Sequence, residues 1–121
     1  MKILVADDHF ANRLLVIEIL KCLGHDSIEA ANGKEVLDVL EKESDIDLVF
    51  MDLEMPVMTG FEAMRFIRDM MLHPKNEIPI IALTAHQENT YDEPAFKKGF
   101  DERLLKPYSI ERIEEILQSY Q

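Results

Sequence analysis

Five side chains with reactive groups stand at the ends of short apolar segments in this chain of 121 residues. They are, in chain order, Asp7, Asp8, Asp52, Thr84 and Lys106. Three carboxylates in one pocket repel one another, and a hard divalent cation such as Mg²⁺ or Mn²⁺ relieves that repulsion. A carboxylate can also attack a phosphoryl group, while a cation and an ammonium neutralise the transferred oxygens. If the five converge, their types predict phosphoryl transfer to Asp52.

Taken one at a time, these residues have simpler interpretations. An Asp at the end of a strand is usually a turn former, and a single Lys is usually a solvated surface charge. The dipeptide Lys106-Pro107 can simply end a strand. It is the joint placement at several strand ends that favours a functional site, with Thr84 as a hydrogen-bond donor to a phosphoryl oxygen.

The elements that position them alternate along the chain. Short runs, mostly apolar but more polar in the second, predict five strands: Lys2–Ala6, Asp26–Ala30, Asp47–Met51, Ile78–Leu83 and Asp101–Leu105. Apolar residues at helical spacing predict five helices: Phe10–Leu23 with Gly24 as its stop, Lys34–Lys42, Phe61–Leu72, Gln87–Lys98, and a last one capped by Ser109. Such alternation favours a parallel α/β sheet with helices on both faces, whose ligands bind beyond the carboxyl ends of the strands.

Composition excludes several classes of function. The formal net charge is −11 and no basic patch is visible, so direct binding to nucleic acid or to an anionic membrane is not expected. No apolar run approaches the roughly 18 residues of a membrane span. The single cysteine, Cys22, cannot form an internal disulfide, which favours the reducing cytoplasm. We expect one domain over residues 1–121, either a complete protein or part of a longer one.

Four stretches of the sequence resemble the receiver domains of response regulators in two-component systems. They are Val5-Ala6-Asp7-Asp8, Met51–Gly60 (Met-Asp-Leu-Glu-Met-Pro-Val-Met-Thr-Gly), Ala82-Leu83-Thr84-Ala85 and Leu105-Lys106-Pro107. The resemblance runs through the whole chain in order. It implies a flavodoxin-like, doubly wound sheet with strand order 2-1-3-4-5 and five helices, acting as a phosphorelay switch rather than a conventional enzyme, with its own autophosphorylation and autodephosphorylation activity.

The resemblance also implies a role for each residue at the site. Asp52 is the phospho-acceptor and a metal ligand, Asp8 binds the metal directly, and Asp7 acts through a metal-bound water. The backbone carbonyl of Glu54 is a third protein ligand. The side chain of Glu54 and that of His86 tune hydrolysis of the phosphoryl group, or else are merely exposed loop residues.

The remaining implied roles concern the switch and its partners. Thr84 contacts the phosphoryl group and reorients on activation, and Lys106 bridges that group and the acidic pocket. The bond before Pro107 is cis. The donor is a phosphohistidine on a sensor histidine kinase or a histidine phosphotransfer protein, and the signal leaves to an output partner or an appended effector domain. His9, next to Asp8, is interpreted as a helix-start residue rather than a metal ligand.

Two positions depart from the family pattern. Arg103 stands where relatives carry Tyr, Phe or His, and Pro94 interrupts the fourth predicted helix. Both lie on the face that relatives use for output. Arg103 either pairs with an acidic residue such as Glu88, Asp92 or Glu93, or is a solvated edge residue.

Other functions stay open at this stage. Arg103 favours a receiver-like interaction module that is not phosphorylated, whereas the complete acidic set with Thr84 and Lys106 argues against it. A phosphatase with an aspartyl intermediate needs a substrate cap that this length hardly provides. A nucleotide-binding domain needs a glycine-rich loop after the first strand, and the sequence has none.

Overall fold

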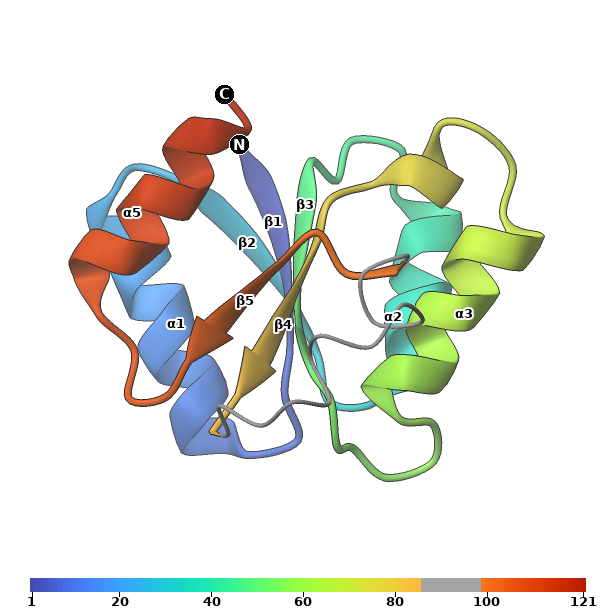
Figure 1. The fold of residues 1–121 in the computed structure, drawn as a ribbon, viewed down its shortest axis with the longest axis horizontal. Coiled ribbons are helices and arrows are strands. Elements are labelled where there is room, and N and C mark those ends of the chain that lie inside the picture. The colour runs from blue at the N-terminus through green and yellow to red at the C-terminus, as the bar shows by residue number, and fades with distance from the viewer. Residues whose placement is uncertain (86–98) are drawn as a thin grey trace.

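Five short strands form one parallel sheet in the computed structural model, which describes residues 1–85 and 99–121. The strands are β1 (Lys2–Ala6), β2 (Asp26–Ala30), β3 (Leu48–Asp52), β4 (Ile80–Thr84) and β5 (Glu102–Leu105). Their spatial order is β2-β1-β3-β4-β5, which confirms the predicted topology (Figure 1). The order reverses between β1 and β3, and such a reversal opens a crevice at the carboxyl ends of the strands.

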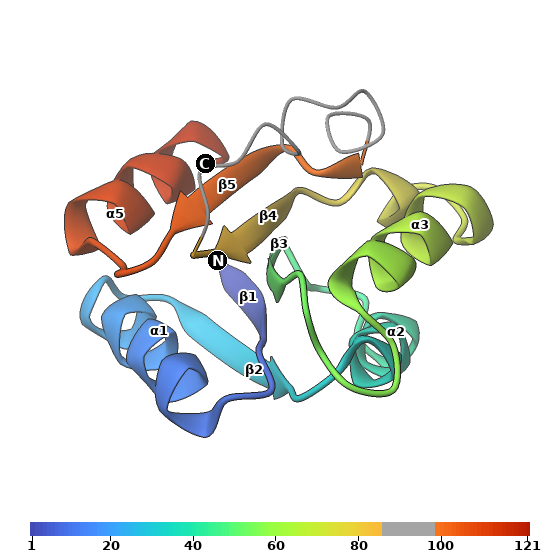
Figure 2. The same ribbon diagram turned by 60° about the horizontal axis from the view of Figure 1, so that its bottom comes forward.

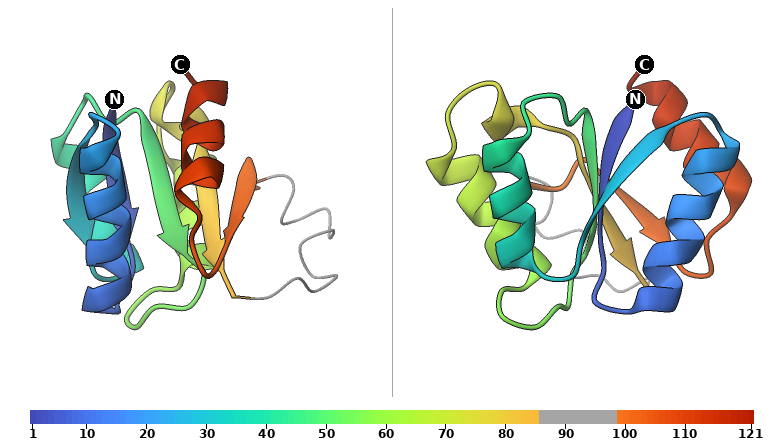
Figure 3. Two further views of the ribbon diagram at one scale, coloured as in Figure 1. Left: turned by 90° about the vertical axis from the view of Figure 1, so that its left-hand side faces the viewer. Right: turned by 180° about the vertical axis from the view of Figure 1, so that it is seen from behind.

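Helices cover both faces of this sheet. Those described are α1 (Phe10–Cys22), α2 (Gly33–Lys42), α3 (Gly60–Met70) and α5 (Ile110–Ser119), with a short 3₁₀ helix η1 (Lys75–Glu77) that the sequence did not predict. The first and last helices lie on one face, and α2 and α3 lie on the other (Figures 1 and 3). The fourth predicted helix, Gln87–Lys98, lies outside the described residues, as does Pro94.

The three central strands, β1, β3 and β4, are largely apolar because side chains alternate between two covered faces, whereas the edge strands β2 and β5 carry polar residues. Ile3 and Val5 of β1 belong to the core beneath α1 and α5. Leu4 and Ala6 belong to the opposite core, beneath α2 and α3. Phe50 of β3 is fully buried on the α1 side. Both cores therefore hold the central strands in place, and with them the strand ends.

Several predicted boundaries were wrong by one or two residues, for identifiable reasons. The fourth strand begins at Ile80, not Ile78, because Pro79 has no N–H and the Ile78 N–H donates to the Lys75 carbonyl of η1. The third strand extends to include Asp52. The first helix ends at Cys22, and Gly24 follows with φ of 86°, as its predicted stop role requires.

The start of α3 is fixed against the end of β3. Thr59 and Glu62 form a reciprocal capping box at this helix. The Gly60 N–H donates to the Leu53 carbonyl at 2.9 Å. A Cβ atom at Gly60 would clash with the carbonyl oxygen of Asp52. Glycine at this position thus permits the close approach that holds the loop after Asp52.

An arginine on α3 joins three segments at the opposite, amino end of the sheet. The Arg68 guanidinium donates to the carbonyls of Asn76, Ile78 and Gly99 and to the Asp101 carboxylate. That carboxylate also accepts the Ile80 N–H at 2.8 Å. Arg68 therefore connects α3 to the beginnings of β4 and β5.

We expect Arg68→Met to lower the free energy of unfolding by about 3 kcal/mol, because buried acceptors lose charged donors. The measurement is urea unfolding followed by circular dichroism. Arg65→Met is the matched control, since Arg65 lies on the same helix in an exposed pair with Asp69 and its loss costs at most about 0.5 kcal/mol. Equal losses in the two variants would contradict the joining role of Arg68.

Candidate functional site

The carboxyl ends of the parallel strands lie at one edge of the sheet, the edge that comes forward in Figure 2. Asp7 and Asp8 follow β1, while Asp52 and Thr84 are the last residues of β3 and β4. The register pairs Ala6 with Met51 and Asp52 with Leu83, so no strand extends far past its neighbour. Lys106 follows β5, and its N–H donates to the Thr84 carbonyl at 2.8 Å.

The acidic residues differ in exposure although they share one rim. Asp7 is fully buried and Asp52 is 7% exposed, whereas Asp8 faces solvent. One oxygen of the Asp7 carboxylate accepts the His9 N–H at 2.9 Å. The other, Oδ2, is buried without a hydrogen-bond partner among the described residues. An orphaned carboxylate oxygen in a polar cleft is suited to a cation or to its water.

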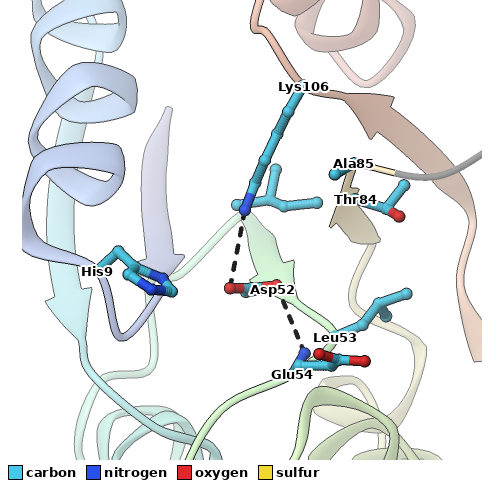
Figure 4. Close-up of a pocket in the computed structure, with 8 residues that line it drawn as sticks. His9, Asp52, Leu53, Glu54, Thr84, Ala85 and Lys106 are labelled. Carbon is cyan, nitrogen blue, oxygen red and sulfur yellow. Dashed lines mark hydrogen bonds and ion pairs between the residues drawn. The ribbon is translucent and has the colours of Figure 1, made fainter.

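Within residues 1–85 and 99–121, one ammonium faces the two buried carboxylates. The Lys106 Nζ lies 3.8 Å from Asp7 Oδ2 and 3.9 Å from Asp52 Oδ2 (Figure 4). These separations exceed the roughly 2.8 Å of a charge-assisted hydrogen bond, so the ammonium attracts both groups without contacting either closely. The Lys106–Pro107 peptide bond is cis, as the resemblance implied.

The surroundings of Asp52 disfavour its charged form. Burial, and then the neighbouring Asp7 carboxylate, raise the pKa of Asp52 to about 6, although Lys106 and the Glu54 N–H act in the opposite direction. That N–H donates to Asp52 Oδ1 at 3.4 Å, which holds the Glu54 backbone beside the carboxylate. Without a cation, therefore, the pocket destabilises the charged form of Asp52.

The donor set fits a hard divalent cation. Carboxylate oxygens of Asp7, Asp8 and Asp52 lie within 4.8 Å of one another, together with a ring nitrogen of His9. Oxygen ligands of this kind suit Mg²⁺ or Mn²⁺. Asp8 and Asp52 would hold the ion, beside the Glu54 backbone whose N–H donates to Asp52. The cleft is open enough for a phosphoryl group, and its wall includes Thr84, Ala85 and Lys106.

Three other predicted residues are placed only in part. The side chain of Glu54 is exposed at the mouth of the cleft. His86 lies outside the described residues. Arg103 is half-buried on β5, on the face opposite Leu104, and the acidic partners considered for it, Glu88, Asp92 and Glu93, also lie outside the described part of the chain.

Sequence reasoning missed the involvement of two residues beside the site. His9 caps α1 with its backbone, as interpreted, but its ring turns toward the two carboxylates that precede it. Its position next to the Asp-Asp pair was the available signal. Tyr108 has a buried hydroxyl with no partner in the described residues, and burial and then Asp7 raise its pKa. No sequence signal pointed to Tyr108.

Known proteins share this arrangement over nearly the whole chain. The family model for the response regulator receiver domain matches residues 3–118. Sporulation initiation phosphotransferase F of Bacillus subtilis is 32% identical over 119 residues, which cover 98% of this chain and 92% of that protein. The receiver domain of sensor histidine kinase PA1611 from Pseudomonas aeruginosa, solved with a magnesium ion in its active-site cleft, is similar with a TM-score of 0.87 at 29% identity, over 98% of this chain and 95% of that one.

Many relatives are much longer than this chain. Sensor histidine kinase RcsC of Escherichia coli is 35% identical over 99% of this chain but only 12% of its own length. The chain spans 7% and 10% of the hybrid signal transduction histidine kinases I and K of Dictyostelium discoideum. None of the described helices has both the length and the apolar character to cross a bilayer. With the fold, the cleft and the family match in agreement, the chain belongs to the response regulator receiver domains.

Proposed function

We propose that this domain, residues 1–121, is a phosphorelay switch that accepts a phosphoryl group on Asp52 from a phosphohistidine. The observation that carries the proposal is the buried Asp52 carboxylate at the end of β3, with the Lys106 ammonium 3.9 Å away and the orphaned Asp7 oxygen beside it. Asp52 is thus a nucleophile in a pocket whose carboxylates favour binding of a cation, and this pocket is open to solvent on one side.

The residues divide the work of the transfer. An oxygen of Asp52 forms a bond to phosphorus as the bond from phosphorus to the donor imidazole nitrogen breaks. The donor ring, protonated on its other nitrogen, takes the electron pair of the broken bond and leaves as neutral imidazole. Lys106 and the Thr84 hydroxyl stabilise charge on the transferred oxygens. Asp7 and Asp8 hold the cation site, and a bound Mg²⁺ supplies further neutralising charge. The same groups would allow autophosphorylation from small donors and slow hydrolysis, with Glu54 and His86 tuning the water.

The signal leaves through the residues around Thr84. We infer that Thr84 moves toward the phosphoryl group and shifts the face formed by β5, α5 and the fourth predicted helix. Arg103 lies on β5 of that face. The output partner is either a separate protein or a domain appended to this one, since relatives include both short and very long chains.

The donor is inferred from the relatives. Their names describe sensor histidine kinases and a phosphotransferase, which supports a kinase or a histidine phosphotransfer protein as the source. The exposed, unpaired Cys22 is compatible with a reducing cytoplasm as the compartment. The acidic balance gives no support for nucleic acid as a direct partner.

Incubation with acetyl phosphate and Mg²⁺ is expected to add one phosphoryl mass to the intact protein. The addition should vanish without Mg²⁺ and in Asp52→Asn, because both the nucleophile and charge neutralisation are needed. Asp69→Asn, on the exposed side of α3, is the control and should be phosphorylated normally. Unchanged labelling of Asp52→Asn would overturn the assignment, and no labelling from acetyl phosphate or from a phosphohistidine donor would favour the unphosphorylated interaction module.

The pKa of Asp52 gives a second prediction, for the metal-free protein. Below about pH 4 the Asp52 carboxyl is protonated in both the folded and the unfolded state. The folded state then carries no penalty from a buried charge at this position. As the pH rises through the folded-state pKa of about 6, the proton is lost and stability falls. We therefore expect Asp52→Asn to be more stable than the wild type at pH 7.5 by about 1–3 kcal/mol, and the two to converge near pH 4.

Chemical unfolding across this pH range, in the presence of a chelator, measures the difference. Asp69→Asn again serves as the control and should follow the wild type at every pH. Adding Mg²⁺ should stabilise the wild type more than Asp52→Asn. A wild type that is equally stable relative to Asp52→Asn at pH 4 and pH 7.5 would contradict the repulsion argued for this pocket.

A further inference from the structure

The ring of His9 is not used to build the helix that it starts. It caps α1 with backbone in the extended region, and its side chain makes no capping hydrogen bond. Instead Nδ1 lies 3.2 Å from Asp8 Oδ1 and 3.5 Å from Asp7 Oδ1. The ring lines the same cleft as Asp52 and faces it across the opening (Figure 4).

These separations match adjacent positions around one ion. Ligands about 2.1 Å from an octahedral ion lie about 3 Å apart when adjacent and about 4.2 Å apart when opposite. The Nδ1 distances to Asp7 and Asp8 are close to the adjacent spacing. Ligand atoms from these three residues and Asp52 all lie within 4.8 Å of one another.

A second observation points to a ligand independently of the ring. Asp7 is fully buried, yet its Oδ2 has no hydrogen-bond partner among the described residues. Lys106 is 3.8 Å from that oxygen, too far to satisfy it. Among the described residues, a buried carboxylate oxygen is therefore left for a cation or for a water bound to it.

We propose that His9 Nδ1 is an additional metal ligand, so that this receiver favours divalent transition ions that accept nitrogen over Mg²⁺. The inference rests on the proposed function in that it takes the carboxylate cleft to hold the ion. Imidazole suits Ni²⁺, Zn²⁺ and Fe²⁺, whereas Mg²⁺ prefers oxygen. Nδ1 would bind through its lone pair while Nε2, which points away, keeps the ring proton.

Isothermal titration at pH 7.5 with Mg²⁺ and, separately, with Ni²⁺ tests the inference. His9→Asn should weaken Ni²⁺ binding about tenfold or more while changing Mg²⁺ binding less than about threefold. His73→Asn is the matched control, because His73 is similarly exposed and lies 3.4 Å from Glu77 but away from the cleft. It should change neither affinity. Asp8→Asn should weaken both ions.

The outcomes separate the two proposals. If Asp8→Asn abolishes binding of both ions but His9→Asn changes neither, or changes both equally, His9 is not a ligand and the inference fails alone. Tighter Mg²⁺ binding by His9→Asn also overturns it, since the ring would then act as a competing cation. If the wild type binds neither ion, the inference falls together with the metal dependence in the proposed function. Saturation with Zn²⁺ should also move the Nδ1 resonance of His9 and leave that of His73 in place.

Discussion

The rest of this structure depends on a repulsion: Asp7 and Asp52 are held side by side at the edge of a sheet, out of water, with one ammonium between them. Their carboxylates are positioned by backbone, because β1 and β3 are paired neighbours whose ends lie level. The pocket therefore stores an electrostatic cost that a cation, or a chemical change at Asp52, relieves.

Packing and hydrogen bonds in the rest of the domain offset the electrostatic repulsion between Asp7 and Asp52. The strands below the pocket are buried on both faces, and each core draws on two helices. At the amino end of the sheet, the Arg68 guanidinium and the Asp101 carboxylate satisfy several backbone groups at once. At the carboxyl end, by contrast, the Asp7 Oδ2 and the Tyr108 hydroxyl have no partners in the described residues. Buried polar groups are thus left without hydrogen bonds near the proposed functional site, as is common in natural proteins.

The same contrast explains why a small change at the cleft can affect the fold. The Lys106 backbone is hydrogen-bonded to the end of β4, while its side chain reaches the carboxylates. Thr84 belongs to β4 and also lines the cleft. A new charge on Asp52 would therefore act on residues that are integral to the edge of the sheet, and the strand ends convey it toward β5. His9 adds a group on the opposite side of the opening, one that would act through the ion.

The sequence by itself determined the order and type of the described strands and α-helices and the set of residues at the rim, but not the 3₁₀ helix η1. Two strong periodicities, together with an Asp, Thr or Lys at the ends of four of the five strands, were enough, because parallel α/β topology leaves few ways to arrange them. The sequence did not predict where β4 begins near Pro79, because this depends on which N–H groups the neighbouring 3₁₀ helix uses. Only the tertiary structure decided that Asp7 is buried while Asp8 is not, that a Tyr108 hydroxyl is enclosed nearby, and that the His9 ring faces the carboxylates. Those outcomes depend on packing between segments distant in sequence, and residue type and spacing do not encode the direction in which a side chain points.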